Sequence, residues 1–180
     1  GRTFSQDRMT QPPIRRRLEP LLRRCMHLYW RFSRGLTFGV RAAVIDAKNR
    51  VFLVRHTYVA GWHLPGGGVE TGETALDALR RELKEEGNIA LAGEPVLHGL
   101  FFNRHVSRRD HVAVYVVRRF TQGAPPSPNR EIADCGFFDM AALPADVTRG
   151  TQRRLDEVMQ GRAVSADWLP DANGAFDGAA

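Results

Sequence analysis

The sequence predicts an α/β (α+β) fold, in which helices pack against the faces of a mixed β-sheet and an extra basic helix precedes the sheet. Two observations predict this class. Apolar runs typical of strands fall into two groups, one before residue 66 and one after residue 93. Helical patterns lie between these groups, over 74–86, and after them, over 148–160. Strands and helices in this order are typical of a sheet covered by helices.

The length and composition predict one domain with additions at its ends. A chain of 180 residues with 43% hydrophobic content can build one core and is too short for two comfortable ones. We expect a flexible N-terminus or a remnant of expression at 1–13, a basic amphipathic helix at 14–34, the folded domain at 35–162 and a flexible tail at 163–180.

The predicted N-terminal helix is the source of the chain's positive charge. Residues 1–35 hold nine arginines against Asp7 and Glu19, whereas the net charge of the whole chain is +6. Apolar residues recur in this segment at the spacing of an amphipathic helix, namely Leu18, Leu21, Leu22, Cys25, Leu28, Tyr29 and Phe32. We expect the helix to dock on the domain. The alternatives are a targeting segment, a membrane-surface helix, a subunit contact or a nucleic-acid contact through the arginines.

Cysteine usage and hydropathy restrict the environment of the chain. Cys25 and Cys135 lack the spacing of a zinc site or a disulfide framework. We expect Cys135 to act as a small buried hydrophobe. No run of about 18 apolar residues is present, so we expect no transmembrane segment. A cytoplasmic location fits these features, with a homodimer as one arrangement.

The strands follow from alternation and turn residues. Residues 37–54 form two apolar runs around a turn at Lys48 and Asn49, which predicts a β-hairpin. A short extended segment at 62–65 leads into three glycines at 66–68, where the backbone must approach another group closely or adopt a positive φ. Further elements are expected as strands at 94–103 and 111–120, the second central, a proline-rich loop at 121–130 and a strand at 131–139.

The segment 74–86 is the clearest helix of the sequence. Thr74 and Asp77 form a capping-box pattern at its start, and Gly87 and Asn88 tolerate a left-handed conformation at its end. At about 100° per residue, the apolar residues Leu76, Leu79 and Leu83 share one narrow sector. We expect that sector to face the sheet.

Three glutamates, Glu82, Glu85 and Glu86, lie together beside the apolar sector, and no lysine stands at i+4 to relieve them. The ordinary interpretation is a solvated acidic face. In a walled site, however, carboxylates ~6 Å apart repel by roughly 3 kcal/mol per pair at an effective dielectric near 20, so such a cluster requires a cation. Oxygen ligands without His or Cys favour Mg²⁺, or Mn²⁺, which also bridge to substrate phosphates. The helix therefore predicts a divalent-metal site for phosphate chemistry.

A linear pattern runs through the same helix. Gly67 is followed after five residues by Glu73 and after seven more by Arg81-Glu82-Leu83-Lys84-Glu85-Glu86, with the aliphatic Ile89 at the end. This pattern resembles the Nudix box, GX5EX7REUXEEXGU, of the Nudix (MutT-like) hydrolases. Asn88 stands where the box has its last glycine, and Gly87 lies one position early. Leu64-Pro65-Gly66-Gly67 and, later, Phe137-Phe138 with Leu143-Pro144 also resemble the family. The resemblance covers about 37–160 and implies the Nudix-type mixed sheet between helices.

The resemblance also implies roles for the box residues. Glu82, Glu85 and Glu86 would hold the divalent ions, with the Gly67 carbonyl as a further ligand. Arg81 would orient Glu82 through a salt bridge, and Glu73 would order the junction of loop and helix or hold a water beside the metal. Either Glu85 or Glu82 would be the general base that activates the attacking water.

Outside the box the candidates are weaker. Glu131 could supply a late catalytic carboxylate or simply begin a strand. Tyr58 and Trp62 could stack on a base or lie in the core. Candidate phosphate contacts, for most of which a solvated face is the simpler explanation, are Arg55, His56, His63, Arg104, His105, Arg108 and Arg109.

The resemblance implies an Mg²⁺-dependent pyrophosphohydrolase acting on a nucleoside diphosphate linked to another group. The substrate stays open among a nucleoside triphosphate, a nucleotide sugar, ADP-ribose and a 5′-capped RNA. The alternative function is a Nudix-like module that senses a nucleotide or contacts RNA through the N-terminal arginines, with little catalysis. A small-molecule partner is favoured over nucleic acid, because no acidic residue of the box is missing.

Overall fold

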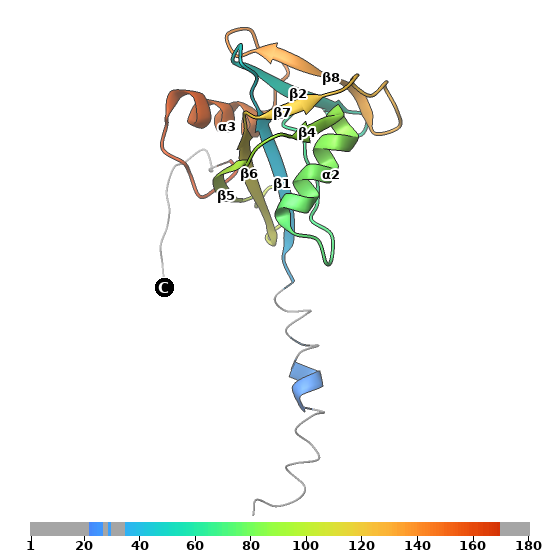
Figure 1. Ribbon diagram of the computed structural model, residues 1–180. Helices are drawn as coiled ribbons and strands as arrows, with labels where there is room; N and C mark the ends of the chain where they lie inside the picture. Colours follow the sequence, from blue (N-terminus) through green and yellow to red (C-terminus); the bar gives the residue numbers. More distant parts are fainter. Residues whose placement is uncertain (1–21, 27–28, 30–34, 170–180) are drawn as a thin grey trace, which may run out of the picture. The chain divides into compact units, whose positions relative to one another are not determined.

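The computed structural model describes residues 22–26, 29 and 35–169 (Figure 1). The chain divides into two units, 1–35 and 36–180. In the first unit, residues 22–26 and 29 are helical, and the rest of the predicted basic helix lies outside the described residues. Its docking therefore stays a prediction. No helix in the described ranges is long and apolar enough to cross a membrane.

The second unit is built on two three-stranded sheets. In one, β6 (Asp110–Val117) lies between β1 (Thr37–Val44), which runs parallel to it, and β5 (Val96–Phe102), which is antiparallel. The other has β2 (Arg50–His56) between β3 (Trp62–His63) and β8 (Ile132–Asp139), with both pairings antiparallel. The expectation that the apolar run after 110 is a central strand is confirmed.

The predicted β-hairpin over 37–54 is wrong. The turn is present, because the Asp46 carboxylate accepts the N–H groups of Lys48 and Arg50. Beyond one bridge between Ile45 and Val51, however, β1 and β2 pair with different partners and separate into the two sheets. Both strands bury residues on each face. Two apolar runs around a turn therefore fit a hairpin and also fit two strands that diverge into separate sheets.

A third, two-stranded sheet was not expected. Strand β4 (Ile89–Leu91) pairs antiparallel with β7 (Phe120–Gln122), so the predicted loop at 121–130 begins two residues too early. The Gln122 side chain also donates to the Gly87 carbonyl at 2.9 Å. Segments this short carry too few residues to show a period of two.

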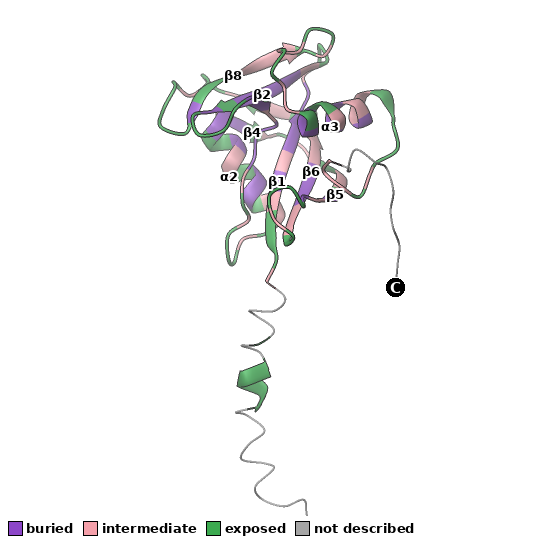
Figure 2. Cartoon of the chain, turned by 180° about the vertical axis from the view of Figure 1, so that it is seen from behind, coloured by how far each residue is buried: buried purple, intermediate pink, exposed green. Residues whose placement is uncertain are grey.

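Two helices cover the strands from opposite sides, α2 (Ala75–Gly87) and α3 (Arg149–Gln160) (Figure 1). The side chains on one face of β1 and β2 belong to one hydrophobic core, and those on the other face belong to a second core. Val40, Ala42, Phe52 and Val54 pack with Leu79 and Leu83 of α2. The intervening residues Ala43, Val51 and Leu53 pack with Leu155 of α3. Figure 2 shows the buried residues concentrated along β1, β2 and the inner faces of the helices. The predicted sheet between helices is confirmed.

Backbone hydrogen bonds join the start of α3 to β3. Trp62 donates its N–H to Asp146 at 3.0 Å, and its carbonyl accepts from Thr148 at 3.1 Å. Thr148 is the N-cap of α3 and accepts from the Thr151 N–H. Because β3 runs directly into the glycine-rich segment 66–68, the N-terminus of α3 fixes the chain just ahead of the Nudix-like pattern.

The predicted flexible tail, 163–180, is described as far as residue 169. Over that stretch the backbone bonds to the end of β5, where Phe102 donates to Ala166 and Trp168 donates to Phe102. Arg154 of α3 is fully buried beneath this segment, and its guanidinium lies over the rings of Phe101 and Trp168, 3.9 and 5.4 Å from their centroids.

Candidate active site

Helix α2 begins and ends as its sequence predicts. The Thr74 hydroxyl accepts the Asp77 N–H, and the Asp77 carboxylate accepts the Thr74 N–H, which completes a capping box. At the other end Asn88 adopts the left-handed conformation, with φ of 50°, and donates its N–H to Leu83 and Lys84. Asparagine therefore serves where the Nudix box has glycine.

The glycine-rich segment before α2 passes very close to other atoms. Gly66 has a φ of 141°, and a Cβ atom there would lie 2.0 Å from the Val40 carbonyl oxygen. A Cβ atom on Gly67 would lie 2.2 Å from Oε1 of Glu82. These contacts bring the backbone of the loop directly onto the first glutamate of the helix, and the carbonyl of Gly67 accepts from the Val40 N–H at 2.9 Å.

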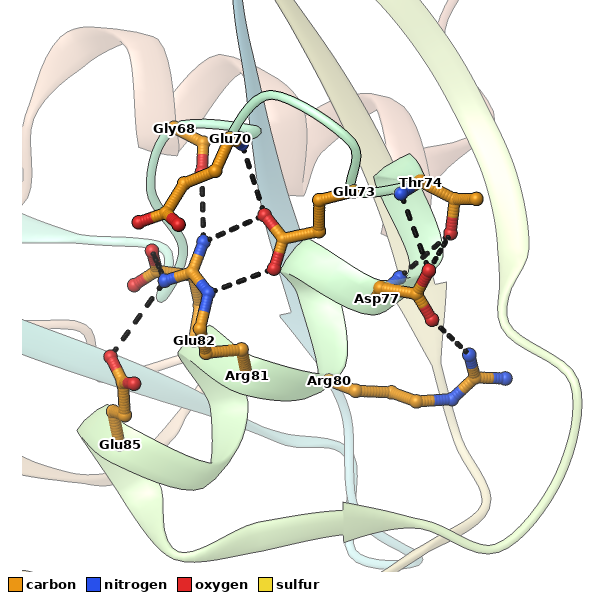
Figure 3. A network of polar contacts seen from close by, with 9 residues as sticks. All are labelled: Gly68, Glu70, Glu73, Thr74, Asp77, Arg80, Arg81, Glu82 and Glu85. Atoms are coloured by element: carbon orange, nitrogen blue, oxygen red, sulfur yellow. Dashed lines mark hydrogen bonds and ion pairs between the residues drawn. The ribbon is translucent and has the colours of Figure 1, made fainter.

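Arg81 is the centre of a polar network that joins the loop to the helix (Figure 3). Its guanidinium contacts both carboxylate oxygens of Glu73, at 2.9 and 3.0 Å, and the Gly68 carbonyl at 3.0 Å. The predicted ion pair with Glu82 is present at 2.7 Å, and Glu85 lies 3.8 Å away at i+4. The hydrogen bonds from Arg81 hold the pKa of the Glu73 carboxyl below its ordinary value.

The three box glutamates occupy three different environments. The Glu82 side chain is 14% exposed, that of Glu85 is 61% exposed and that of Glu86 is 9% exposed. Glu86 turns inward and accepts the Gly66 N–H at 2.8 Å. Burial raises the pKa of the Glu86 carboxyl to about 7. The helical wheel places these residues together but does not indicate that one of them enters the interior.

His56 lies beside Glu86, with its Nε2 3.7 Å from Oε1 of the glutamate. Burial lowers the pKa of His56 to about 4, helped by the positive charge of Arg41. The imidazole is therefore neutral at pH 7, and the contact is not an ion pair. Arg41 donates to the carbonyls of Leu64 and Gly66 at 2.9 Å each, and so braces the loop.

The donor atoms of the box suit a hard divalent cation. Glu82, Glu85, Glu86 and the Gly67 carbonyl offer oxygen only, the set that Mg²⁺ and Mn²⁺ prefer. A buried carboxyl such as Glu86 is also stabilised in its charged form by a nearby cation. Within the described ranges, the side chains of His, Cys, Asp and Glu form no group of three already converged on one point. In their chemistry, the donors fit a divalent metal.

A cavity of about 540 Å³ opens beside the box. Of the residues that the sequence suggested for substrate contact, Tyr58, His56, His63 and His105 line it, together with Gly67. Four others, which the sequence did not single out, are Phe38, Arg41, Arg149 and Trp168. Arg41 carried a weak signal, since it is a charged residue within an otherwise uncharged strand. Trp168 carried none, because its place depends on the packing of the C-terminal segment.

The remaining candidates do not line this cavity. Trp62 is buried in the core and packs edge-on against Phe138, with ring centroids 4.7 Å apart. Arg55 pairs with Asp146 at 3.2 Å, and Arg104 with Asp167 at 3.2 Å. Glu131 is exposed before β8, and Cys135 is partly buried. Neither Arg108 nor Arg109 lines the cavity.

Several known proteins are similar to this chain. A family model described as NUDIX domain matches residues 35–158. An RNA pyrophosphohydrolase of Francisella tularensis subsp. mediasiatica is 42% identical over 52 residues, which are 29% of this chain and 34% of that protein. An m7GpppN-mRNA hydrolase of Danio rerio is 27% identical over 164 residues, covering 79% of this chain and 52% of that protein. The matches thus span between about a third and a half of these relatives.

Solved structures with the same fold include a NUDIX hydrolase. The MutT NUDIX hydrolase from Burkholderia pseudomallei superposes with a TM-score of 0.59 at 26% identity, covering 69% of this chain and 98% of that one.

Proposed function

Because the chain belongs to the NUDIX domain family, we propose that it hydrolyses the diphosphate linkage of a nucleoside diphosphate derivative, with Mg²⁺ or Mn²⁺ held by Glu82, Glu85, Glu86 and the Gly67 carbonyl. The observation that supports this most directly is the network around Arg81. It ties Glu73 of the loop to Glu82 and Glu85 of the helix, and it also bonds the carbonyl of Gly68, which lines a cavity large enough for a nucleotide although the network's carboxylates do not.

Different residues of the chain have different roles in this proposed reaction. A divalent ion bound here would lower the pKa of the attacking water and neutralise the phosphate that leaves. Glu85 or Glu82 takes the proton of that water. Arg81 occupies Oε1 of Glu82 at 2.7 Å, whereas its contact with Glu85 is long, at 3.8 Å, and leaves that carboxylate freer to move. Tyr58, which is exposed at the cavity, offers an aromatic face to a base.

The test of the site is Glu85→Gln, an uncharged residue of the same size. We expect Mg²⁺-dependent turnover to fall at least ~100-fold, the scale typical of losing one catalytic group. The thermal midpoint should hardly change, because Glu85 is exposed. Glu94→Gln, an exposed glutamate outside the box, is the matched control and should keep full turnover. Equal rates in the two variants would contradict the assignment.

The substrate is identified by a panel. Nucleoside triphosphates, nucleotide sugars, ADP-ribose and 5′-capped or 5′-triphosphorylated RNA each contain the linkage. RNA belongs in the panel because both curated relatives are named for hydrolysis of RNA ends. Tight binding without turnover of any member would instead support the sensing or RNA-binding module.

A further inference from the structure

His56, at the end of β2, is a buried polar residue without a hydrogen bond. It is 7% exposed, and among the described residues neither Nδ1 nor Nε2 has a hydrogen-bond partner; the ring lies near the Glu131 backbone without hydrogen-bond geometry. A buried polar group left in this state destabilises the folded protein, so such groups are rare and call for an explanation. A leucine would fill the same interior space without that cost.

The surroundings of His56 direct it toward one neighbour. Its ring packs between Tyr58 and His63, whose centroids lie 5.1 and 5.7 Å away, and it forms part of the cavity wall. Oε1 of Glu86 lies 3.7 Å from Nε2, while the other oxygen of that carboxylate is fixed by the Gly66 N–H at 2.8 Å. A hydrogen bond requires about 3.0 Å, so a movement of less than about 1 Å would complete one between them.

We propose that His56 is a positioning residue for Glu86, donating its Nε2–H to Oε1 when that carboxylate holds a divalent ion. With Gly66 on one oxygen and His56 on the other, the carboxylate is oriented from two sides. It keeps lone pairs for the metal, because a carboxylate offers about four acceptor positions. Partners of this kind hold ligands in place, and their loss typically lowers metal affinity 10–100-fold. The inference rests on the proposed function in treating Glu86 as a metal ligand.

The test measures metal binding without substrate. Mn²⁺ and Mg²⁺ affinities are determined by calorimetry for the full chain, for His56→Leu, which removes the donor, and for His56→Gln, which keeps an N–H group. We expect His56→Leu to bind both ions about 10-fold more weakly and His56→Gln to recover most of that loss. The metal-free thermal midpoint of His56→Leu should equal or exceed that of the parent, because an unsatisfied polar group is removed.

Two controls separate positioning from other roles. His111→Leu removes another histidine with an unpartnered buried nitrogen, away from the cavity lining, and should bind metal normally. Glu86→Gln should lose metal affinity outright. Unchanged affinity in His56→Leu would overturn the inference, as would a His56→Gln variant no better than His56→Leu. A loss confined to Mn²⁺ would also overturn it, since it would indicate direct ligation by the imidazole. A parent chain that binds metal but hydrolyses no substrate would contradict the proposed function alone.

Discussion

At the scale of single residues, two adjacent arginines on α2 have very different settings. Arg81 makes a bidentate contact with Glu73 and a second ion pair with Glu82, and it is mostly shielded from solvent. Arg80 reaches only Asp77, at 3.4 Å on an exposed face. The planar fork of arginine matches a carboxylate in a way that a lysine ammonium cannot.

We therefore predict that Arg81→Lys lowers the free energy of unfolding by about 1–2 kcal/mol, because charge-assisted hydrogen bonds are lost from a partly buried site. Arg80→Lys is the matched control and should change it by less than about 0.5 kcal/mol, as expected for an exposed pair. Urea denaturation at pH 7 measures both. Similar values for the two variants would mean that the network around Arg81 contributes little.

The residue scale also shows what the sequence could and could not predict about the site. The resemblance to the Nudix box implies the Arg81–Glu82 pair, which the structure contains, whereas helix geometry alone does not bring adjacent side chains together. The inward turn of Glu86 could not be predicted, because it depends on Gly66 and His56, which reach it from other parts of the chain. The cavity wall formed by Trp168 depends in the same way on long-range packing.

At the scale of elements, the C-terminal end of α2 packs closely on β2. A Cβ atom on Gly87 would lie 2.8 Å from the ring of Phe52, which is fully buried and packs against Phe137. We predict that Gly87→Ala destabilises the domain by about 1–3 kcal/mol through this overpacking, despite the better helix propensity of alanine.

The next residue provides the contrast. Asn88→Gly suits the left-handed conformation and loses two exposed side-chain hydrogen bonds, one that Asn88 donates to the Ala124 carbonyl and one that it accepts from Lys84. The change should stay within about 0.5 kcal/mol. Thermal denaturation of both variants separates the two effects. Gly87→Ala reports on packing, and Asn88→Gly reports on backbone conformation. A Gly87→Ala variant as stable as its parent would show that Phe52 can give way.

The capping box at the start of α2 predicts a pH dependence. Hydrogen bonds from Thr74 hold the pKa of the Asp77 carboxyl below its ordinary value of 3.8. A carboxyl whose pKa is depressed by folding stabilises the folded state above its unfolded pKa, and the contribution disappears as pH falls through the folded value. Asp77→Asn should therefore be less stable than the parent at pH 7, and the difference should shrink below about pH 4. A constant difference across that range, measured by chemical denaturation, would contradict this origin.

Element boundaries were predictable where a cap or a break in periodicity marks them, as at Thr74, Asn88 and Thr148. Strand pairing was less predictable. The apolar runs around the Lys48–Asn49 turn predict two strands correctly. Their pairing partners, β6 and β8, lie far away in the sequence. Local pattern specifies a strand, and the rest of the fold specifies its neighbour.

At the scale of the whole molecule, Arg154 joins α3, β5 and the segment after residue 163. It lies over two aromatic rings, contacts Glu157 at 2.7 Å and donates to Ser165 and to the carbonyls of Asp167 and Trp168. We predict that Arg154→Met costs about 3–5 kcal/mol, because it leaves Glu157 charged and buried with His98 as its close partner.

Two further variants examine that reason. Arg153→Met removes a neighbouring, more exposed arginine, 3.8 Å from the same glutamate, and should cost under about 1 kcal/mol. Arg154→Met combined with Glu157→Gln should recover part of the loss, since the stranded charge is gone. A double variant no more stable than Arg154→Met would assign the effect to packing on Phe101 and Trp168 instead.

The hydrogen bonds between Trp62 and the start of α3 have a consequence for synthesis of the chain. The glycine-rich loop at 66–68 leaves β3 early in the sequence, but its anchor at Asp146 and Thr148 is among the last parts of the domain to be made. A polypeptide growing on the ribosome would contain every residue of the box before the segment that anchors the loop has been synthesised. Translation that stops short of α3 should therefore yield a fragment with the whole box and no enzymatic rate, whereas completing that helix should bring the rate on abruptly.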